Sequence, residues 1–141
     1  MDLGLTGRTA AVAGGSAGLG FATAQALAND GVRVVLCGRD AKRAADAAAK
    51  IGHACVGIVA DVSTVSGGES FIAQATKILG QIDILILNSG GPPAGNFAST
   101  DIASYETALQ NGLMSMIAMT KLVVPAMQTR KWGRVVAITS V

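Results

Sequence analysis

Eight residues near the start of the chain, Ala13-Gly14-Gly15-Ser16-Ala17-Gly18-Leu19-Gly20, have the composition of a phosphate-binding loop. Glycine permits a tight turn and close approach by a ligand, and the amide groups at the start of a helix attract negative charge. The run lies between a predicted strand and a predicted helix, which is the context that a diphosphate site requires. The alternative is a turn that serves only helix–sheet packing. We expect a diphosphate to be held by Gly14, Ser16, Gly18, Leu19 and Gly20.

The elements that must position this loop alternate between apolar runs of strand length and helical stretches. Strands are predicted at 8–13, 33–38, 54–60, 82–87 and 134–139. Helices are predicted at 19–29, 41–51, 66–80, 101–109 and 112–129. Asp40 has the type and place of an N-cap for the second helix, and Ser66 with Glu69 fits a capping box for the third.

This alternation predicts right-handed crossovers and a parallel sheet. Five strands in this pattern form an α/β, doubly wound sheet in the order 3-2-1-4-5, which is the front of a Rossmann fold. A β/α barrel would need eight units, and the chain has about four. We therefore expect residues 1–141 to form a single dinucleotide-binding domain.

The composition excludes several classes of protein. The formal net charge is +2 and no basic run appears, so we expect no nucleic-acid partner. No apolar run approaches the length of a membrane span, and we expect none. Cys37 and Cys55 lack metal-ligand spacing and predict reduced thiols in a cytoplasmic protein. The mean hydropathy of +0.48 is high, so we expect a partner or further sequence to cover part of the apolar surface.

Five features together resemble the short-chain dehydrogenase/reductase family. They are the Gly-x3-Gly-x-Gly spacing of the loop, Asp61, Asn88-Ser89-Gly90, Asn111 and Ser140. The resemblance spans the whole chain and is strongest to members similar to 3-oxoacyl-carrier-protein reductases with an Asn-Ser-Gly-Gly-Pro-Pro loop. Two positions depart from the family pattern, because Ala13 stands where a threonine is usual and Leu87-Asn88-Ser89-Gly90 replaces Asn-Asn-Ala-Gly.

The resemblance implies a nicotinamide dinucleotide cofactor, and the end of the second strand indicates which one. A carboxylate there would bind the adenosine ribose hydroxyls and favour NAD, but the chain has Gly38-Arg39. The guanidinium of Arg39 can pair with a 2′-phosphate, so we expect NADP in preference to NAD. The alternative is that Arg39 is only a solvated residue at a strand end.

The resemblance also assigns residues to the adenine and to the middle of the cofactor. Asp61 contacts the adenine, with backbone help from Val62; alternatively, Asp61 is a loop or helix-capping carboxylate. Asn88, Ser89 and Gly90 lie beside the cofactor, and Asn88 can also tie strands together by hydrogen bonds.

The reaction itself is implied to be hydride transfer between the nicotinamide and a small-molecule carbonyl or secondary alcohol. Ser140 binds the substrate oxygen, and Asn111 holds a water in a proton relay; alternatively, Asn111 bonds only backbone groups. The family's acid/base residue is a tyrosine in a Tyr-x3-Lys motif beyond the serine. Tyr105 is not that residue, since no lysine follows it at the fourth place.

We therefore interpret the chain as the cofactor-binding part of an NADP-dependent short-chain oxidoreductase that lacks the C-terminal part of the fold after the fifth strand. On its own it is expected to be inactive and to self-associate through the open edge of that strand. In this family the long helix 112–129 implies a homo-oligomer. The alternative is a non-catalytic nucleotide-binding fragment or scaffold protein. A methyltransferase that binds S-adenosylmethionine fits the glycine spacing poorly.

Overall fold

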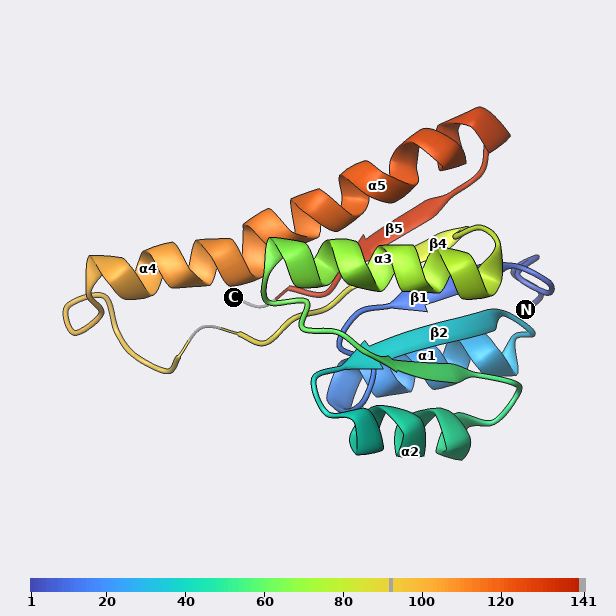
Figure 1. Ribbon diagram of the computed structural model, residues 1–141, viewed down its shortest axis with the longest axis horizontal. Coiled ribbons are helices and arrows are strands. Elements are labelled where there is room, and N and C mark those ends of the chain that lie inside the picture. The colour runs from blue at the N-terminus through green and yellow to red at the C-terminus, as the bar shows by residue number, and fades with distance from the viewer. Residues whose placement is uncertain (92, 140–141) are drawn as a thin grey trace.

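A five-stranded sheet organises the computed structural model, which describes residues 1–91 and 93–139 (Figure 1). Every neighbouring pair of strands is parallel, and the order is β3-β2-β1-β4-β5. The predicted α/β doubly wound sheet is confirmed. The strands are β1 (Thr9–Val12), β2 (Arg33–Gly38), β3 (Val56–Val59), β4 (Ile84–Leu87) and β5 (Arg134–Ala137).

Helices cover the two faces of the sheet in pairs (Figure 1). Helices α1 and α2 lie on one face, and α3 and α5 lie on the other. Each crossover joins two parallel strands through a helix, as right-handed βαβ units require. The helices are α1 (Gly18–Asn29), α2 (Ala41–Ile51), α3 (Val65–Leu79), α4 (Ile102–Ala108), η1 (Leu109–Met114, a π-helix) and α5 (Ser115–Arg130).

Two apolar layers hold the helices to the sheet. Because successive strand residues point to opposite faces, Val12 packs with α1 and α2 whereas Ala11 packs with α3 and α5. Both β1 and β4 are buried along their whole length. All four residues of β5 are exposed, so the sheet has one apolar edge that the described residues leave uncovered.

The start of α3 differs from the prediction. Thr64, not Ser66, is the N-cap: its backbone is extended, and its Oγ1 accepts a hydrogen bond of 3.0 Å from the amide of Gly67. Ser66 already lies in the first helical turn. Asp40 caps α2 as predicted, because its carboxylate accepts a bond of 2.8 Å from the amide of Arg43.

The helices predicted at 101–109 and 112–129 are not separated by a break. The π-helical η1 joins α4 directly to α5. A π-helical turn accommodates an extra residue without ending the helix, and such turns occur often at functional sites.

Both cysteines are free thiols, as predicted. Burial raises the pKa of Cys37 to about 12 and that of Cys55 to about 11. Across residues 1–91 and 93–139, no helix is both long and apolar enough to cross a membrane. In the same part of the chain, no three His, Cys, Asp or Glu side chains are grouped as metal ligands would be.

Candidate functional site

The glycine-rich segment forms the turn between β1 and α1. The amide of Ala13 donates to the carbonyl of Ile86, and the amide of Gly15 donates to the carbonyl of Cys37, each at 2.9 Å. These bonds fix the turn to both strands that flank β1. Helix α1 begins at Gly18, and no side chain caps its first turn. Its first amide groups therefore remain available to an anion.

Two of the glycines are required by close packing. A Cβ on Gly20 would lie 2.2 Å from the carbonyl oxygen of Gly14, and a Cβ on Gly14 would lie 2.8 Å from that of Asn88. Gly18 differs, because it has a positive φ of 57° and no atom within 4 Å of the place of a Cβ. The turn thus packs tightly on its inner side and is open on its outer side.

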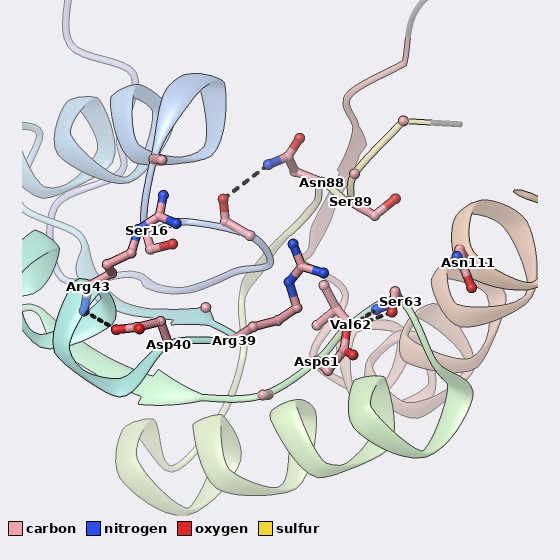
Figure 2. Close-up of a pocket in the computed structure, with 16 residues that line it drawn as sticks. Ser16, Arg39, Asp40, Arg43, Asp61, Val62, Ser63, Asn88, Ser89 and Asn111 are labelled. Atoms are coloured by element: carbon pink, nitrogen blue, oxygen red, sulfur yellow. Dashed lines mark hydrogen bonds between the residues drawn. The ribbon is translucent and has the colours of Figure 1, made fainter. Parts of the chain in front are cut away.

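A cavity of about 510 Å³ lies where the carboxyl ends of β1, β2, β3 and β4 meet (Figure 2). Its walls come from the glycine turn and from the segments that follow the other three strands. In open parallel sheets this is the place where ligands bind. It is lined by Gly14, Ser16, Ala17, Gly38, Arg39, Asp40, Arg43, Ala60, Asp61, Val62, Ser63, Asn88, Ser89, Gly90, Gly91 and Asn111.

Nine of the predicted site residues line this one cavity. They are Gly14, Ser16, Arg39, Asp61, Val62, Asn88, Ser89, Gly90 and Asn111. Three others from the glycine turn are placed elsewhere. Gly18 borders a neighbouring cavity of about 340 Å³, Leu19 is 68% exposed, and Gly20 is buried beneath the turn. Ser140 lies outside the described residues.

Two arginines reach the cavity from the segment that joins β2 to α2 (Figure 2). Arg39 follows β2, and Arg43 lies in the first turn of α2. The nearby carboxylates already have partners within their own segments. Asp40 caps α2, and Asp61 accepts hydrogen bonds from the amide (3.0 Å) and the hydroxyl (2.6 Å) of Ser63. Both carboxylates remain charged, but their oxygens already accept hydrogen bonds, so the two guanidinium groups are the charged donors here that remain open to an anion.

The environment of Asp61 keeps it ionised. The hydroxyl and amide of Ser63 lower the pKa of this carboxyl. Burial raises the pKa by less, and the positive charge of Arg39 adds a still smaller lowering. Asp61 lies in the loop between β3 and α3 and does not cap α3, since Thr64 does.

Asn88 joins two segments of the site. Its side-chain amide donates a hydrogen bond of 3.1 Å to the carbonyl oxygen of Gly14 (Figure 2). Beyond it the chain runs along the cavity, and no atom lies within 4 Å of the place of a Cβ on Gly90 or Gly91. The backbone there is open to a ligand.

Asn111 lies in η1, at the edge of the cavity (Figure 2). Its side chain is partly buried and forms no hydrogen bond with any other of the described residues. Within residues 1–91 and 93–139 there is thus no side-chain hydrogen bond from Asn111 to a backbone group, which the alternative role of this residue would require.

The sequence analysis did not assign Arg43, which lines the cavity, or Ser115, which lies behind its wall. Arg43 could have been found from its position. The predicted helix starts directly after Arg39 and Asp40, so a side chain in its first turn lies near the same end of the sheet as Arg39. Ser115, which is completely buried and bonds to the backbone of Val62, carried no comparable signal.

The comparisons with known proteins agree with this geometry. The sequence pattern of a family described as short chain dehydrogenase matches residues 8–141. The ketoacyl reductase HetN of a Nostoc species is 34% identical over 139 residues, which cover 96% of this chain and 48% of HetN. The chain spans about half the length of the curated relatives it matches.

Solved structures show the same relationship. A short chain dehydrogenase/reductase family protein superposes with a TM-score of 0.88 at 32% identity, over 99% of this chain and 57% of the other. The Pseudomonas aeruginosa RhlG/NADP active-site complex superposes with a TM-score of 0.86 at 30% identity, over 96% of this chain and 56% of RhlG.

Proposed function

The chain belongs to the short-chain dehydrogenase family, and we propose that it forms the NADP-binding part of an oxidoreductase that interconverts a carbonyl and a secondary alcohol. The names of two similar proteins support this proposal: HetN is a ketoacyl reductase, and RhlG has been solved with NADP. In this proposal residues 1–141 act as a single dinucleotide-binding domain. The proposed activity and substrate are those of a whole family member. HetN, for example, is about twice as long as this chain.

The residues present fit a dinucleotide. The uncapped start of α1 offers amide groups to a diphosphate, and the outer side of Gly18 leaves room for one. The open backbone at Gly90 and Gly91 leaves room beyond the end of β4. Asp61 and Val62 form the wall that we assign to the adenine, and Ser89 lines the same cavity after β4.

The observation that carries the choice of NADP is the pair of arginines at the cavity wall. Arg39 and Arg43 both line it, whereas Asp40 and Asp61 are engaged in their own segments. A guanidinium forms strong, charge-assisted hydrogen bonds with a phosphate. A carboxylate that binds ribose hydroxyls is absent from position 38, which is glycine. The site therefore favours a 2′-phosphate.

When bound, the nicotinamide supplies or accepts the hydride. We assign Ser140 to bind the substrate oxygen and Asn111 to hold a water for proton transfer. The acid/base tyrosine and its lysine are not among these 141 residues, since the single tyrosine, Tyr105, lies in α4 without a lysine four places later. We thus expect this chain alone to bind nucleotide and to turn over no substrate.

An apolar stripe favours assembly with further copies. Leu109, Leu113 and Ile117 are spaced four residues apart along η1 and α5, and each is at least 42% exposed. Side chains at this spacing share one face of a helix. We propose that this face contacts another protomer in a homo-oligomer.

Titration with NADPH and NADH tests the proposed cofactor. We expect NADPH to bind more tightly, and Arg39→Ala and Arg43→Ala each to weaken NADPH about tenfold or more, since a charged hydrogen bond contributes about 1.5–3 kcal/mol. NADH affinity should hardly change. Arg33→Ala, an exposed arginine at the opposite end of β2, is the matched control. Equal affinity for both nucleotides would contradict the choice of NADP, and binding of neither would contradict the function.

A further inference from the structure

Ser115 has a buried hydroxyl that the proposed roles do not use. Among the described residues, three polar side chains are buried, and the other two, Thr9 and Asp83, bond to each other near the amino ends of β1 and β4. Ser115 lies at the start of α5 with none of its surface exposed. A hydroxyl is costly to bury unless it has a partner, so its partner indicates its role.

The partners of Ser115 belong to the wall of the cavity. Its Oγ donates a hydrogen bond to the carbonyl oxygen of Val62 and lies 3.2 Å from that of Thr64. The hydroxyl has one proton, so the two carbonyls share it. Both carbonyls belong to the loop 61–64, between β3 and α3, in which Asp61 and Ser63 are also bonded to each other. The loop is thus internally bonded and fastened to α5 by one side chain.

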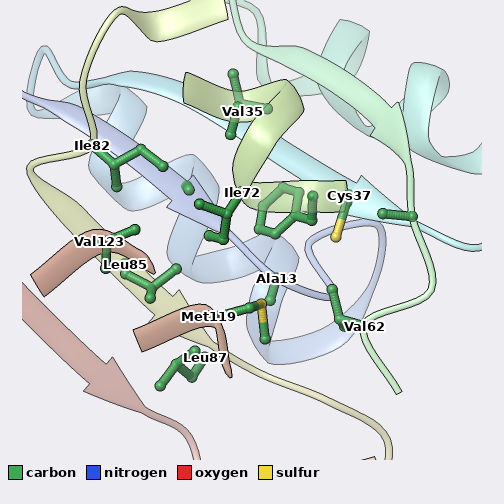
Figure 3. Packing of buried hydrophobic residues seen from close by; sticks show 14 of the residues in the cluster. Ala13, Val35, Cys37, Val62, Ile72, Ile82, Leu85, Leu87, Met119 and Val123 are labelled. Carbon is green, nitrogen blue, oxygen red and sulfur yellow. The ribbon is translucent and has the colours of Figure 1, made fainter. Parts of the chain in front are cut away.

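Close contact between α3 and α5 keeps this bond in place. A Cβ on Gly68 would lie 3.0 Å from both Ser115 Oγ and Met119 Cγ. Val62 and Met119 belong to the same buried cluster (Figure 3). A Cβ at position 68 would require Ser115 or Met119 to give way by a few tenths of an ångström, so a substitution there acts directly on this contact.

Asn111 lies at the edge of the cavity, four residues before Ser115, in the π-helical η1 that continues directly into α5. Val62 and Ser63 line the neighbouring wall. Ser115 therefore connects two walls of one cavity: the loop assigned to adenine and the π-helical turn assigned to the water.

We infer that Ser115 is a positioning residue, which holds the loop 61–64 against the start of α5 and so sets the affinity of the adenine end of the nucleotide. This inference rests on the proposed NADP site. It assigns Ser115 no contact with the cofactor, because its hydroxyl is consumed by backbone carbonyls of the loop.

Nucleotide binding by Ser115→Ala tests the inference. We expect Ser115→Ala to bind NADPH about tenfold more weakly than the wild type, because a buried carbonyl is left without a donor. Adenosine 2′,5′-bisphosphate, which contains only the adenine end of NADPH, should lose affinity by the same factor. Thr120→Ala is the matched control, since the Thr120 hydroxyl bonds within α5 to the carbonyl of Met116 at 2.8 Å. Equal affinities of the two variants would overturn the inference. If Ser115→Ala does not fold, Ser115→Cys, which leaves only a weak S–H donor in place of the hydroxyl, is measured instead.

Two further measurements separate this inference from the proposed function. Amide exchange in residues 61–68 should be faster in Ser115→Ala than in Thr120→Ala, whether or not nucleotide binds; unchanged exchange would overturn the positioning role. Gly68→Ala should weaken NADPH in the wild-type background and have a smaller effect beside Ser115→Ala, because the two changes act on one contact. Additive effects would contradict a shared contact. Failure of the unaltered protein to bind either nucleotide would defeat the proposed function instead.

Discussion

The side-chain amide of Asn88 donates a hydrogen bond to the carbonyl oxygen of Gly14, 74 residues earlier in the chain. The same amide nitrogen lies 2.8 Å from the place where a Cβ on Gly20 would stand. One side chain thus joins the segment after β4 to the glycine turn after β1 and limits what can stand at the start of α1. The proposed diphosphate site depends on this contact, although Asn88 itself need not touch the ligand.

Substitution of Asn88 should therefore affect both stability and binding. Asn88→Ala leaves the Gly14 carbonyl without its donor and should lower the free energy of unfolding by about 1 kcal/mol. Asn88→Asp should be worse, because it turns a carboxylate toward a carbonyl and adds negative charge beside a phosphate site. Urea denaturation and NADPH titration measure the two effects. Asn29→Ala, at an exposed asparagine at the far end of α1, is the control. An Asn88→Asp protein that binds NADPH like the wild type would contradict this account.

The last two glycines of the turn, Gly18 and Gly20, should respond differently to alanine. In Gly20→Ala the new methyl group would meet the backbone of Gly14 at 2.2 Å, which no side-chain movement can relieve. We expect a loss of about 3 kcal/mol in the free energy of unfolding, as for severe overpacking. Gly18→Ala meets no atom, and only its positive φ is strained, at a cost of about 1–2 kcal/mol. Urea denaturation of both variants checks the order, and a reversed order would show that the turn packs differently.

The buried carboxylate of Asp83 should be essential to the fold and not to the ligand. It accepts hydrogen bonds from Thr9 and from the side chain of Gln81 (3.0 Å), and it lies 3.5 Å from the guanidinium of Arg130. We expect Asp83→Asn to lower the free energy of unfolding by about 3 kcal/mol, as when one partner of a buried pair is removed.

NADPH affinity of folded Asp83→Asn should be unchanged. Asp83 directly precedes β4 and so lies at the amino ends of the strands, whereas the cavity lies at their carboxyl ends. Lys42→Ala, which breaks an exposed ion pair with Asp46, is the control and should leave stability unchanged. A stable Asp83→Asn protein with weakened NADPH binding would contradict both statements.

The order of the elements and of the strands could be predicted because their signals are local. Each element is indicated by residues within it or next to it: apolar runs, the spacing of apolar residues, and a glycine after a helix, such as Gly31 or Gly52. The rule that crossovers are right-handed then leaves one arrangement of the sheet. The strand-end residues Arg39, Asp61 and Asn88 follow from that arrangement, since parallel strands end at one edge. These are the residues that the structure brings into the cavity.

What could not be predicted depends on contacts between distant segments. Thr64 and Ser66 are both acceptable N-caps by type, and the choice depends on how the loop leaves β3. The junction at η1 required knowledge of how α5 packs on α3. Ser115 resembles any other serine at a helix start until Val62, 53 residues earlier, is placed beside it.

The ionisation of Asp61 gives a pH dependence with a defined sign. The bonds from Ser63 and the charge of Arg39 hold the folded pKa below the ordinary value of 3.8, which applies in the unfolded chain. Asp61 therefore stabilises the folded state above about pH 4, and this contribution is lost as the pH falls through the folded pKa. The difference in unfolding free energy between wild type and Asp61→Asn should be largest near neutral pH and smallest at the lowest pH at which both fold.

Ser63→Ala, which removes one of the two donors, should raise the pKa of Asp61 part of the way toward 3.8. Carbon-detected NMR titration of the Asp61 carboxyl measures this directly, and a folded pKa at or above 3.8 would show that the Ser63 bonds do not form.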